Sequence, residues 1–331
     1  MADNTENFII RFWKRIIQCV KDTIRPAFKT IRFLLFIMLP VSFAILLLKS
    51  TGLLQYVSEY MNPLMQFLGL PGEAALAYLS SILMNIYSAI AVIKTISLTD
   101  KQLIILATMC LIAHTFFVEC IVMKKTGSHL RKIVVLRIFM SLLAAWILKN
   151  ILPPGEDFLR ISPAETPEPP KLGFSAEQFM EGLGPWFKES MFLVLQIFLI
   201  VFLVMLLQRI LAEFGLTKKL VKIARPLIVL FGLSPNTAYV WIIANTVGVA
   251  YGAGVMIEEM STGNMTRTEA DIFNHHASIN HSQIEDTLLF VSLGVPYVWA
   301  ALPRLILSII VVWGERIRRA VFRAAFRVNV V

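Results

Sequence analysis

The sequence has few charged side chains for its length. Of 331 residues, 16% are Asp, Glu, Lys or Arg, whereas 57% are hydrophobic, and the mean hydropathy is +0.70. A soluble core of this size would not need so much apolar surface, which argues against a soluble globular protein. Apolar runs such as residues 33–48 and 191–207 approach the roughly 20 residues that span hydrocarbon. We therefore expect an all-α polytopic protein whose surroundings are the lipid bilayer.

Cysteines and nucleotide-binding motifs are also scarce. The three cysteines, Cys19, Cys110 and Cys120, form no CxxC pair, which fits neither a disulfide framework nor a zinc knuckle. There is no Walker A sequence, dinucleotide fingerprint, nucleophile elbow or kinase motif. ATP-driven transport by this chain alone has no support, and we do not expect an enzyme. An ion gradient, or the gradient of the substrate itself, would supply the energy.

The net charge of +9 is concentrated at the two ends of the apolar region. Because basic residues beside membrane spans mark the cytoplasmic side, we expect both termini in the cytoplasm and a multi-pass protein of the cytoplasmic (inner) membrane. This placement argues against nucleic acid as a partner. No small-residue cleavage pattern follows the first apolar run, so the N-terminus is expected to be retained. The basic residues are Arg11, Lys14, Arg15, Lys21, Arg25, Lys29 and Arg32 before that run, and Arg316, Arg318, Arg319, Arg323 and Arg327 after the last.

Identical residues recur at a nearly constant spacing, which indicates an internal duplication. The spacing is 163 positions early in each copy and 167 after one insertion. The expected organisation is a basic N-terminal segment (1–24), a first repeat (25–150), an acidic Pro-rich linker (151–187), a second repeat (188–314) and a basic tail (315–331). The recurring pairs are Gly52 and Gly215, Pro63 and Pro226, Gly69 and Gly232, Thr99 and Thr266, His114 and His281, Arg137 and Arg304, and Trp146 and Trp313.

Loop charges predict that the two repeats have opposite orientations. Residues 49–72 contain few Lys or Arg, whereas their counterpart is basic, so the two loops are expected on opposite sides of the membrane. That requires an odd number of crossings per repeat, and we expect five, near 32–49, 53–70, 74–94, 101–123 and 130–149 in the first copy. Pro63 and Pro226 suggest that the second segment is broken or re-entrant. Inverted repeats are typical of transporters, with the site at the repeat interface; a duplication that only doubles a structural bundle is the alternative.

Residues 274–287 are polar where the matching segment, 107–120, is almost wholly apolar. Ionisable groups at membrane depth usually face a cavity, a partner or an ion path, so this segment is the leading candidate site. Read as one helix, it places His281 and Glu285 one turn apart, where they can share a proton or a cation. A solvated helix face is the alternative. The candidate metal ligands are His275, His276, His281, Glu285 and Asp286.

The matching positions supply a second set of ionisable residues. Arg137 and Arg304 fall in the last span of each repeat, where each must find an acid, a carbonyl or an anionic substrate. In the third span of the second repeat, polar residues and glycines suggest an unwound helix beside a cavity, although close packing explains the glycines equally well. A purely structural ion network is the competing account of the charges. The candidate substrate-binding residues are Asn245, Tyr251, His281, Ser282, Glu285, Asp286, Arg304, His114, Glu119 and Arg137.

These motifs resemble the nucleoside-recognition, or gate-domain, membrane protein family, which includes spore-maturation membrane proteins and the gates of bacterial ferrous-iron transporters. The resemblance rests on the Gly-Leu turns after Pro63 and Pro226, the broken span from Asn245 to Gly254, the segment from His281 to Thr287, and Pro303-Arg304. It implies transport of nucleosides, ferrous iron or small organic acids. The GTP-binding domain of the iron transporters is missing from the sequence, which weakens an iron-import interpretation.

The expected function is therefore that of a secondary transporter or permease for a small polar solute, either nucleoside-like or a small organic anion. The cofactor is unknown; a divalent metal, or H⁺ or Na⁺ as a coupling ion, would suit the His and acid cluster. A divalent metal transporter, a metal-dependent membrane enzyme and a non-catalytic scaffold are the alternatives. Apolar outer faces would also permit a homo-oligomer.

Overall fold

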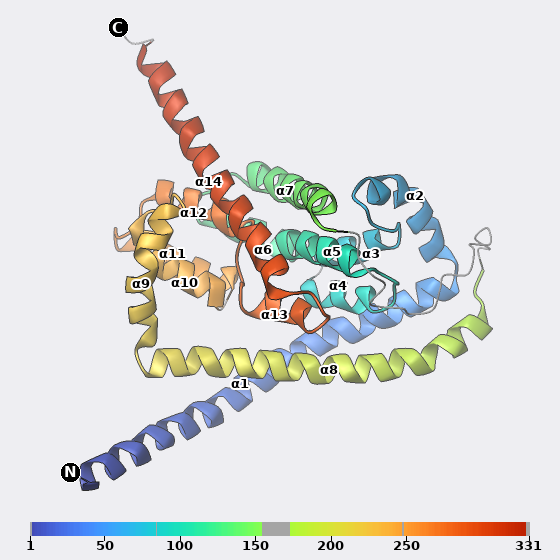
Figure 1. Cartoon of the computed structure of the whole chain (residues 1–331), viewed down its shortest axis with the longest axis horizontal. Coiled ribbons are helices and arrows are strands. Elements are labelled where there is room, and N and C mark those ends of the chain that lie inside the picture. Colours follow the sequence, from blue (N-terminus) through green and yellow to red (C-terminus); the bar gives the residue numbers. More distant parts are fainter. Residues whose placement is uncertain (1, 84, 154–172, 247, 329–331) are drawn as a thin grey trace.

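The protein is built from helices, as expected. The computed structural model describes residues 2–83, 85–153, 173–246 and 248–328, and every regular element in these ranges is helical (Figure 1). The elements are α1 (Ala2–Ser50), α2 (Leu53–Phe67), α3 (Ala74–Leu83), α4 (Ile86–Ile93), α5 (Asp100–Ala113), α6 (Phe116–Lys125), α7 (Leu130–Ile151), α8 (Ala176–Glu213), α9 (Leu216–Leu230), the 3₁₀ turn η1 (Pro235–Thr237), α10 (Ala238–Thr246), α11 (Val249–Ser261), α12 (Arg267–Ala277), α13 (Glu285–Val291) and α14 (Tyr297–Val328).

Two long helices, α1 and α8, pack against each other along one side of the molecule (Figure 1). The basic segment 1–24 is not separate from the first expected span, because α1 continues from it to Ser50. Most of the expected linker, residues 154–172, lies outside the described residues. Its last part is helical, since α8 begins at Ala176 after Ser175, whose hydroxyl accepts a hydrogen bond from the amide of Gln178.

The same local devices recur at matched positions of the two predicted repeats (residues 25–150 and 188–314). Gly52 and Gly215 adopt left-handed backbone conformations immediately before α2 and α9, where a side chain would be strained. Thr99 and Thr266 form capping boxes at the starts of α5 and α12. Local sequence therefore places the helix boundaries in the same order in both copies.

Several expected spans are split into shorter helices. Segment 74–94 is divided at Asn85 into α3 and α4, and segment 101–123 is divided at His114 and Thr115 into α5 and α6. The polar segment 274–287 is also not one helix, because α12 ends at Ala277 and α13 begins at Glu285. The single helical stripe expected through it is therefore wrong.

The prolines expected to interrupt the second segments do not do so. Pro63 lies inside α2 and Pro226 inside α9, and both helices continue past the proline. A proline removes one backbone hydrogen bond, which these helices tolerate. Each helix has 15 residues and is about 22 Å long, which is short of the roughly 30 Å hydrocarbon thickness.

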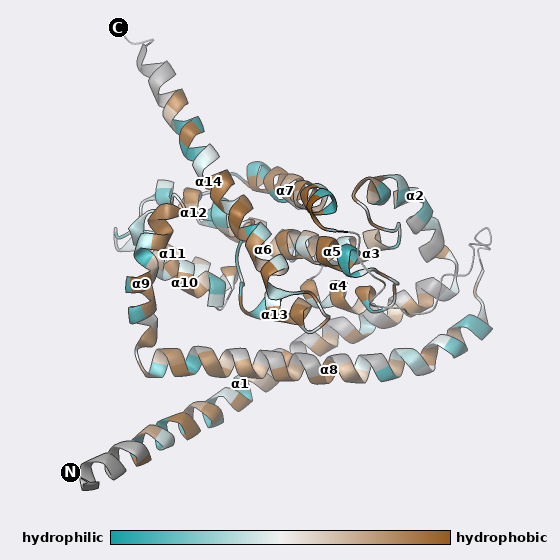
Figure 2. Ribbon diagram, viewed as in Figure 1, coloured by the Kyte–Doolittle hydropathy of each residue, from teal (hydrophilic) through white to brown (hydrophobic). Residues whose placement is uncertain are grey.

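Three helical stretches among the described residues are long and apolar enough to cross a membrane: residues 100–125, 130–151 and 297–322. The first is mostly enclosed by protein, whereas α7 and α14 expose large apolar side chains, including Val135, Phe139 and Ile310. Figure 2 shows hydrophobic residues along the part of α14 nearest α13. Exposed apolar rows of this kind suit contact with lipid. The expected total of ten crossings stays a prediction.

Candidate functional site

Two of the helix breaks meet at the centre of the molecule. His114 ends α5 and His281 follows α12, and the Nε2 atoms of these two rings lie 3.2 Å apart. Their ring centroids are 4.9 Å apart, with 37° between the ring planes. Glu119 and Asp286 complete the group, which we call the paired-histidine site (His114, His281, Glu119 and Asp286). All four residues are buried.

Backbone carbonyls determine which nitrogen of each ring carries hydrogen. Nδ1 of His281 lies 2.6 Å from the carbonyl oxygen of Ala277, and Nδ1 of His114 lies 3.0 Å from that of Leu111. A carbonyl oxygen only accepts, so each Nδ1 must donate, and each Nε2 of a neutral ring is left with a lone pair. Two lone pairs facing each other at 3.2 Å repel. The arrangement therefore calls for a proton or a cation between the rings.

The carboxylates approach the rings reciprocally across the two repeats. Oε1 of Glu119, from α6, lies 3.1 Å from Nε2 of His281, and Oδ2 of Asp286, from α13, lies 3.1 Å from Nε2 of His114. Each acid thus contacts the histidine of the other repeat. Two ring nitrogens and two carboxylate oxygens converge, and all four are acceptors when the rings are neutral. Such a group stabilises positive charge at its centre.

Two fully buried arginines bind the backbone at the helix breaks beside His114 and His281. Arg137 donates from Nη2 to the carbonyl oxygen of His114 at 2.8 Å, and Arg304 donates from Nη1 to that of His281 at 3.2 Å. These bonds pair carbonyl groups that have lost their helical partners. The sequence suggested an acid, a carbonyl or an anionic substrate as the partner of each arginine, and the structure shows carbonyls for both.

Among the described residues, only Arg137 of the two arginines also binds an acid. Nη1 of Arg137 lies 2.7 Å from Oε2 of Glu119, which turns the other oxygen of that carboxylate towards the histidines. Arg304 instead donates to Oγ1 of Thr287 at 2.5 Å and to Oε1 of Gln283 at 3.3 Å. Asp286, which lies 167 positions after Glu119 in the sequence, faces His114. Within the described residues, an arginine therefore fixes the carboxylate of Glu119, whereas none binds that of Asp286.

The residues after the two histidines have unusual backbone conformations. Thr115 and Ser282 both have φ 47°, a left-handed conformation that side chains rarely adopt. The amide of Thr115 donates to the carbonyl of Ser81, at the end of α3, and that of Ser282 donates to the carbonyl of Ala244, near the end of α10. The strained turn is thus supported in the same way in both repeats, by the neighbouring broken helix.

Tyr87 joins the site from α4, which the sequence did not single out as functional. Its hydroxyl donates to Oε1 of Glu285 at 2.8 Å. Tyr87 follows the break at Asn85, in the region that matches the broken span at Asn245, and this was the signal available in the sequence. Glu285 therefore lies beside the paired-histidine site and binds a partner of its own.

Other predicted residues have separate surroundings. Nδ1 of His275 donates to the carbonyl of Asp271, and Nε2 of His276 accepts from the indole of Trp241 at 3.0 Å. Neither ring is part of the paired-histidine site. Asn245 is buried, and its side-chain oxygen has no hydrogen-bond partner within the described ranges. The side chain of Tyr251 lies outside the described residues.

Two groups within the described part of the chain have metal-binding geometry. His114, Glu119 and His281 offer ligand atoms that all lie within 4.8 Å of one another, as do Asp271, His275 and Glu315. In the second group, Glu315 already binds Lys132, Arg318 and Arg319, and Asp271 binds Arg319, so basic side chains neutralise the acids. The first group, with its facing nitrogens, is the better metal or proton site.

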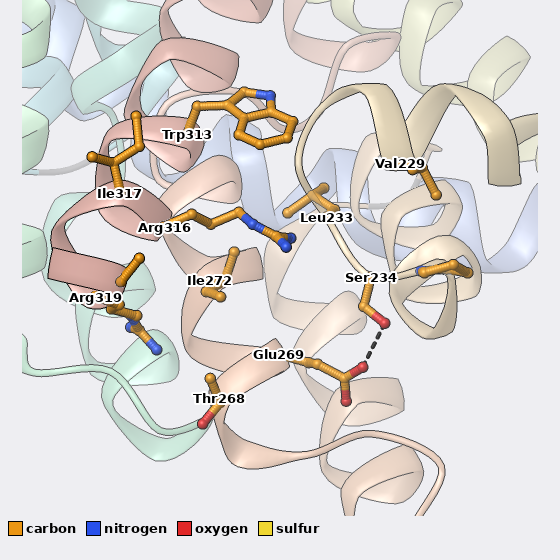
Figure 3. Close-up of a pocket in the computed structure, with 12 residues that line it drawn as sticks. Val229, Leu233, Ser234, Thr268, Glu269, Ile272, Trp313, Arg316, Ile317 and Arg319 are labelled. Atoms are coloured by element: carbon orange, nitrogen blue, oxygen red, sulfur yellow. Dashed lines mark hydrogen bonds between the residues drawn. The ribbon is translucent and has the colours of Figure 1, made fainter. Parts of the chain in front are cut away.

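A surface cavity of about 820 Å³ lies between the end of α9, α12 and the C-terminal part of α14, and the paired-histidine residues do not line it. Figure 3 shows Leu233, Ile272 and Trp313 on its walls, with Ser234 donating to Glu269. Its apolar lining resembles packing between helices more than a polar binding site.

Comparison with known proteins identifies the family. A model described as nucleoside recognition, the gate domain, matches residues 31–130. The uncharacterized membrane protein YvoD of Bacillus subtilis (strain 168) is 30% identical over 270 residues, which cover 80% of this chain and 83% of that protein. The chain belongs to the nucleoside-recognition gate family. No solved structure matches it.

Membership of the gate family confirms the resemblance that the sequence predicted. It also confirms that the chain is a membrane protein. The gate family is associated with transport rather than with catalysis, which favours transport over the enzymatic alternative. The matched region contains His114 and Glu119 and ends before His281 and Asp286. One half of the paired-histidine site therefore comes from the gate domain and the other half from the second repeat.

Proposed function

We propose that this protein is a membrane transporter for a small polar solute, nucleoside-like or a small organic anion, and that a cation bound at the paired-histidine site drives it. The observation that supports this proposal is the pair of histidine Nε2 atoms 3.2 Å apart, each also 3.1 Å from a carboxylate oxygen. Four buried acceptors need positive charge between them. Loss of that charge would push the groups apart, which couples cation binding to the shape of the site.

The two repeats would move relative to each other around this site. The unequal content of Lys and Arg in matching loops supports an inverted arrangement in the cytoplasmic membrane, with both termini inside. Each carboxylate contacts the histidine of the other repeat, so a relative rotation of the repeats changes both contacts at once. Solute binding is assigned to the adjacent broken helices. Asn245 contributes a buried side-chain oxygen that has no hydrogen-bond partner among the described residues, and Tyr251, Ser282 and Glu285 are the further candidates.

A divalent metal ion as the cargo is the second candidate. The grouping of His114, Glu119 and His281, with Asp286 beside it, supports it, because two imidazoles and carboxylates suit zinc and similar ions. In this version the cation at the paired-histidine site is itself transported, and no organic solute is needed.

The test is transport by the purified protein in sealed vesicles, with an imposed pH gradient and a panel of nucleosides and small carboxylates. We expect gradient-driven accumulation of one solute class. His281→Gln should abolish accumulation yet retain downhill exchange, because it removes the coupling cation and not the solute contacts. His129→Gln, at an exposed histidine outside the site, is the matched control.

A chelating dye inside the same vesicles reports entry of Zn²⁺, Mn²⁺ or Fe²⁺. Metal entry without solute accumulation, lost in His281→Gln, would establish the second candidate instead. Solute accumulation that is the same in His281→Gln and in the unaltered protein would contradict the role of the paired-histidine site.

A further inference from the structure

A second cavity, of about 940 Å³, lies where α12 and α14 meet the loop between α6 and α7. It is strongly basic, and we call it the basic cavity. Its lining residues combine parts of both repeats, since the α6–α7 loop belongs to the first and α12 and α14 to the second. The charged side chains that line it are Arg131, Lys132, Arg267, Arg318, Arg319 and Asp271.

Basic side chains outnumber acids in the basic cavity. Five cationic side chains line it, and the two nearby carboxylates are those of Asp271 and Glu315, which leaves three positive charges in excess. Lys132, Arg318 and Arg319 are held by these carboxylates. Arg131 and Arg267 are exposed and form no ion pair within the described ranges. Two guanidinium groups are thus available to an anion.

The backbone of the loop places one of these guanidinium groups. Gly127 has φ +109°, and a Cβ atom there would lie 2.9 Å from Cγ of Arg267. Because Gly127 has no side chain, the aliphatic part of Arg267 can lie over the α6–α7 loop. Arg267 and this loop belong to different repeats. Arg267 is also the first residue of α12, so the positive end of the helix dipole adds to the charge of the cavity.

All three apolar helical stretches end beside the basic cavity. Residues 100–125 finish just before Gly127 and residues 130–151 begin just before Arg131. In residues 297–322 the apolar part gives way to charged residues from Glu315, shortly before Arg318 and Arg319, which line the cavity. Since the change from apolar to charged residues marks the edge of hydrocarbon, this arrangement favours a cavity at the depth of lipid headgroups. The planar guanidinium group of arginine can donate two parallel hydrogen bonds to two oxygens of a phosphate group.

We propose that the basic cavity binds a phosphate group, presented either by an anionic lipid headgroup or by a phosphate compound in solution. The site is independent of the proposed transport function, and it requires the membrane location of the family but no particular orientation. By contrast, the 820 Å³ cavity is lined mainly by apolar residues. Its lining includes the carboxylate of Glu269, and its Arg316 donates to the carbonyl of Gly232. That cavity therefore has fewer free positive charges with which to bind an anion.

The experiment measures the thermal stability of the purified full-length protein in detergent during three separate titrations: phosphatidylglycerol, phosphatidylcholine and inorganic phosphate. Stabilisation by phosphatidylglycerol alone would support the proposal with a lipid as the source. Stabilisation by inorganic phosphate would support it with a soluble source. No stabilisation by either would overturn it, as would equal stabilisation by phosphatidylcholine and phosphatidylglycerol without an effect of phosphate.

Variants locate the effect. Arg131→Ala combined with Arg267→Ala should weaken the apparent affinity by about tenfold or more, since each basic group near an anionic surface adds to binding. Both residues are exposed, so the protein should still fold. The matched control combines Lys222→Ala with Arg225→Ala, two exposed basic residues on α9, and should keep the affinity. An equal loss in the control would overturn the proposal, because it would show a general charge effect.

Discussion

At the scale of single residues, the central question is why two arginines are wholly buried in an apolar protein. Burying a guanidinium is costly unless its donors are paired. Arg304 meets this requirement with the carbonyls of Ala300 and His281, with Thr287 and with Gln283. Its role in the structure is to hold the break that positions His281, so a structural ion network and a functional site are not exclusive alternatives here.

Arg304→Ala is therefore expected to lower stability by about 3 kcal/mol, because it leaves buried acceptors unpaired. Arg304→Lys should recover part of the loss, since it keeps the charge but not the planar fork. The measurement is the apparent melting temperature of the purified protein in detergent. Arg225→Ala, at an exposed position, should change stability by less than about 0.5 kcal/mol. A melting temperature for Arg304→Ala equal to that of the control would show that the buried network contributes little.

At the scale of elements, short helices and their caps build the site. The ends of α5 and α12 carry the histidines, and their starts are fixed by capping boxes. At the start of α12, Glu269 also accepts a hydrogen bond from Ser234, next to η1. Burial alone would raise the pKa of Glu269, but hydrogen bonds from Ser234 and Thr266 outweigh it and hold the pKa below its usual range. This carboxylate links α12 to the turn that follows α9.

A depressed pKa predicts a defined pH dependence. Glu269 contributes stability above its unfolded-state pKa of about 4.3, and the contribution is lost as the pH falls through the lower folded-state value. The unaltered protein should melt at a higher temperature than Glu269→Gln above about pH 5, and the difference should shrink below about pH 4. Melting curves of both proteins across this range provide the check. A difference that stays constant down to low pH would contradict the assignment.

At the scale of the whole molecule, the two predicted repeats are joined through their ionisable groups. Glu119 and Asp286 each contact the histidine of the other repeat, and Arg267 from the second repeat lies over the loop at Gly127 in the first. The long helices α1 and α8, one from each repeat, also pack together (Figure 1). The central contacts are polar and buried, so the cost of leaving any member unpaired is high.

A double-mutant cycle should measure this connection. Glu119→Gln and His281→Gln should be coupled by about 1 kcal/mol or more, because the two side chains belong to one buried network. Glu119→Gln and Arg225→Ala, which belong to different networks, should add within about 0.5 kcal/mol. The melting temperatures of single and double variants supply the energies. Additivity of the first pair would mean that the two repeats are not connected through these residues.

The sequence by itself determined the class of the protein, because composition, apolar runs and recurring residues can be recognised without knowing which residues are in contact. It predicted an all-helical membrane protein of the gate family, and it selected His114, Glu119, His281 and Asp286, since ionisable groups in apolar segments stand out. It could not place the helix breaks at Thr115 and in the segment after Ala277, because these depend on carbonyls of Ser81 and Ala244 that lie far away along the chain.

Only the tertiary structure decided which residues meet. His275 and His276 neighbour His281 in sequence, yet the end of α12 turns them towards Asp271 and Trp241. His114, from the other repeat, occupies the place beside His281. Helical spacing relates side chains on one element only, whereas the partners of a buried charge are chosen by the packing of several elements. The exchange of acids between the two repeats is therefore a property of the folded chain.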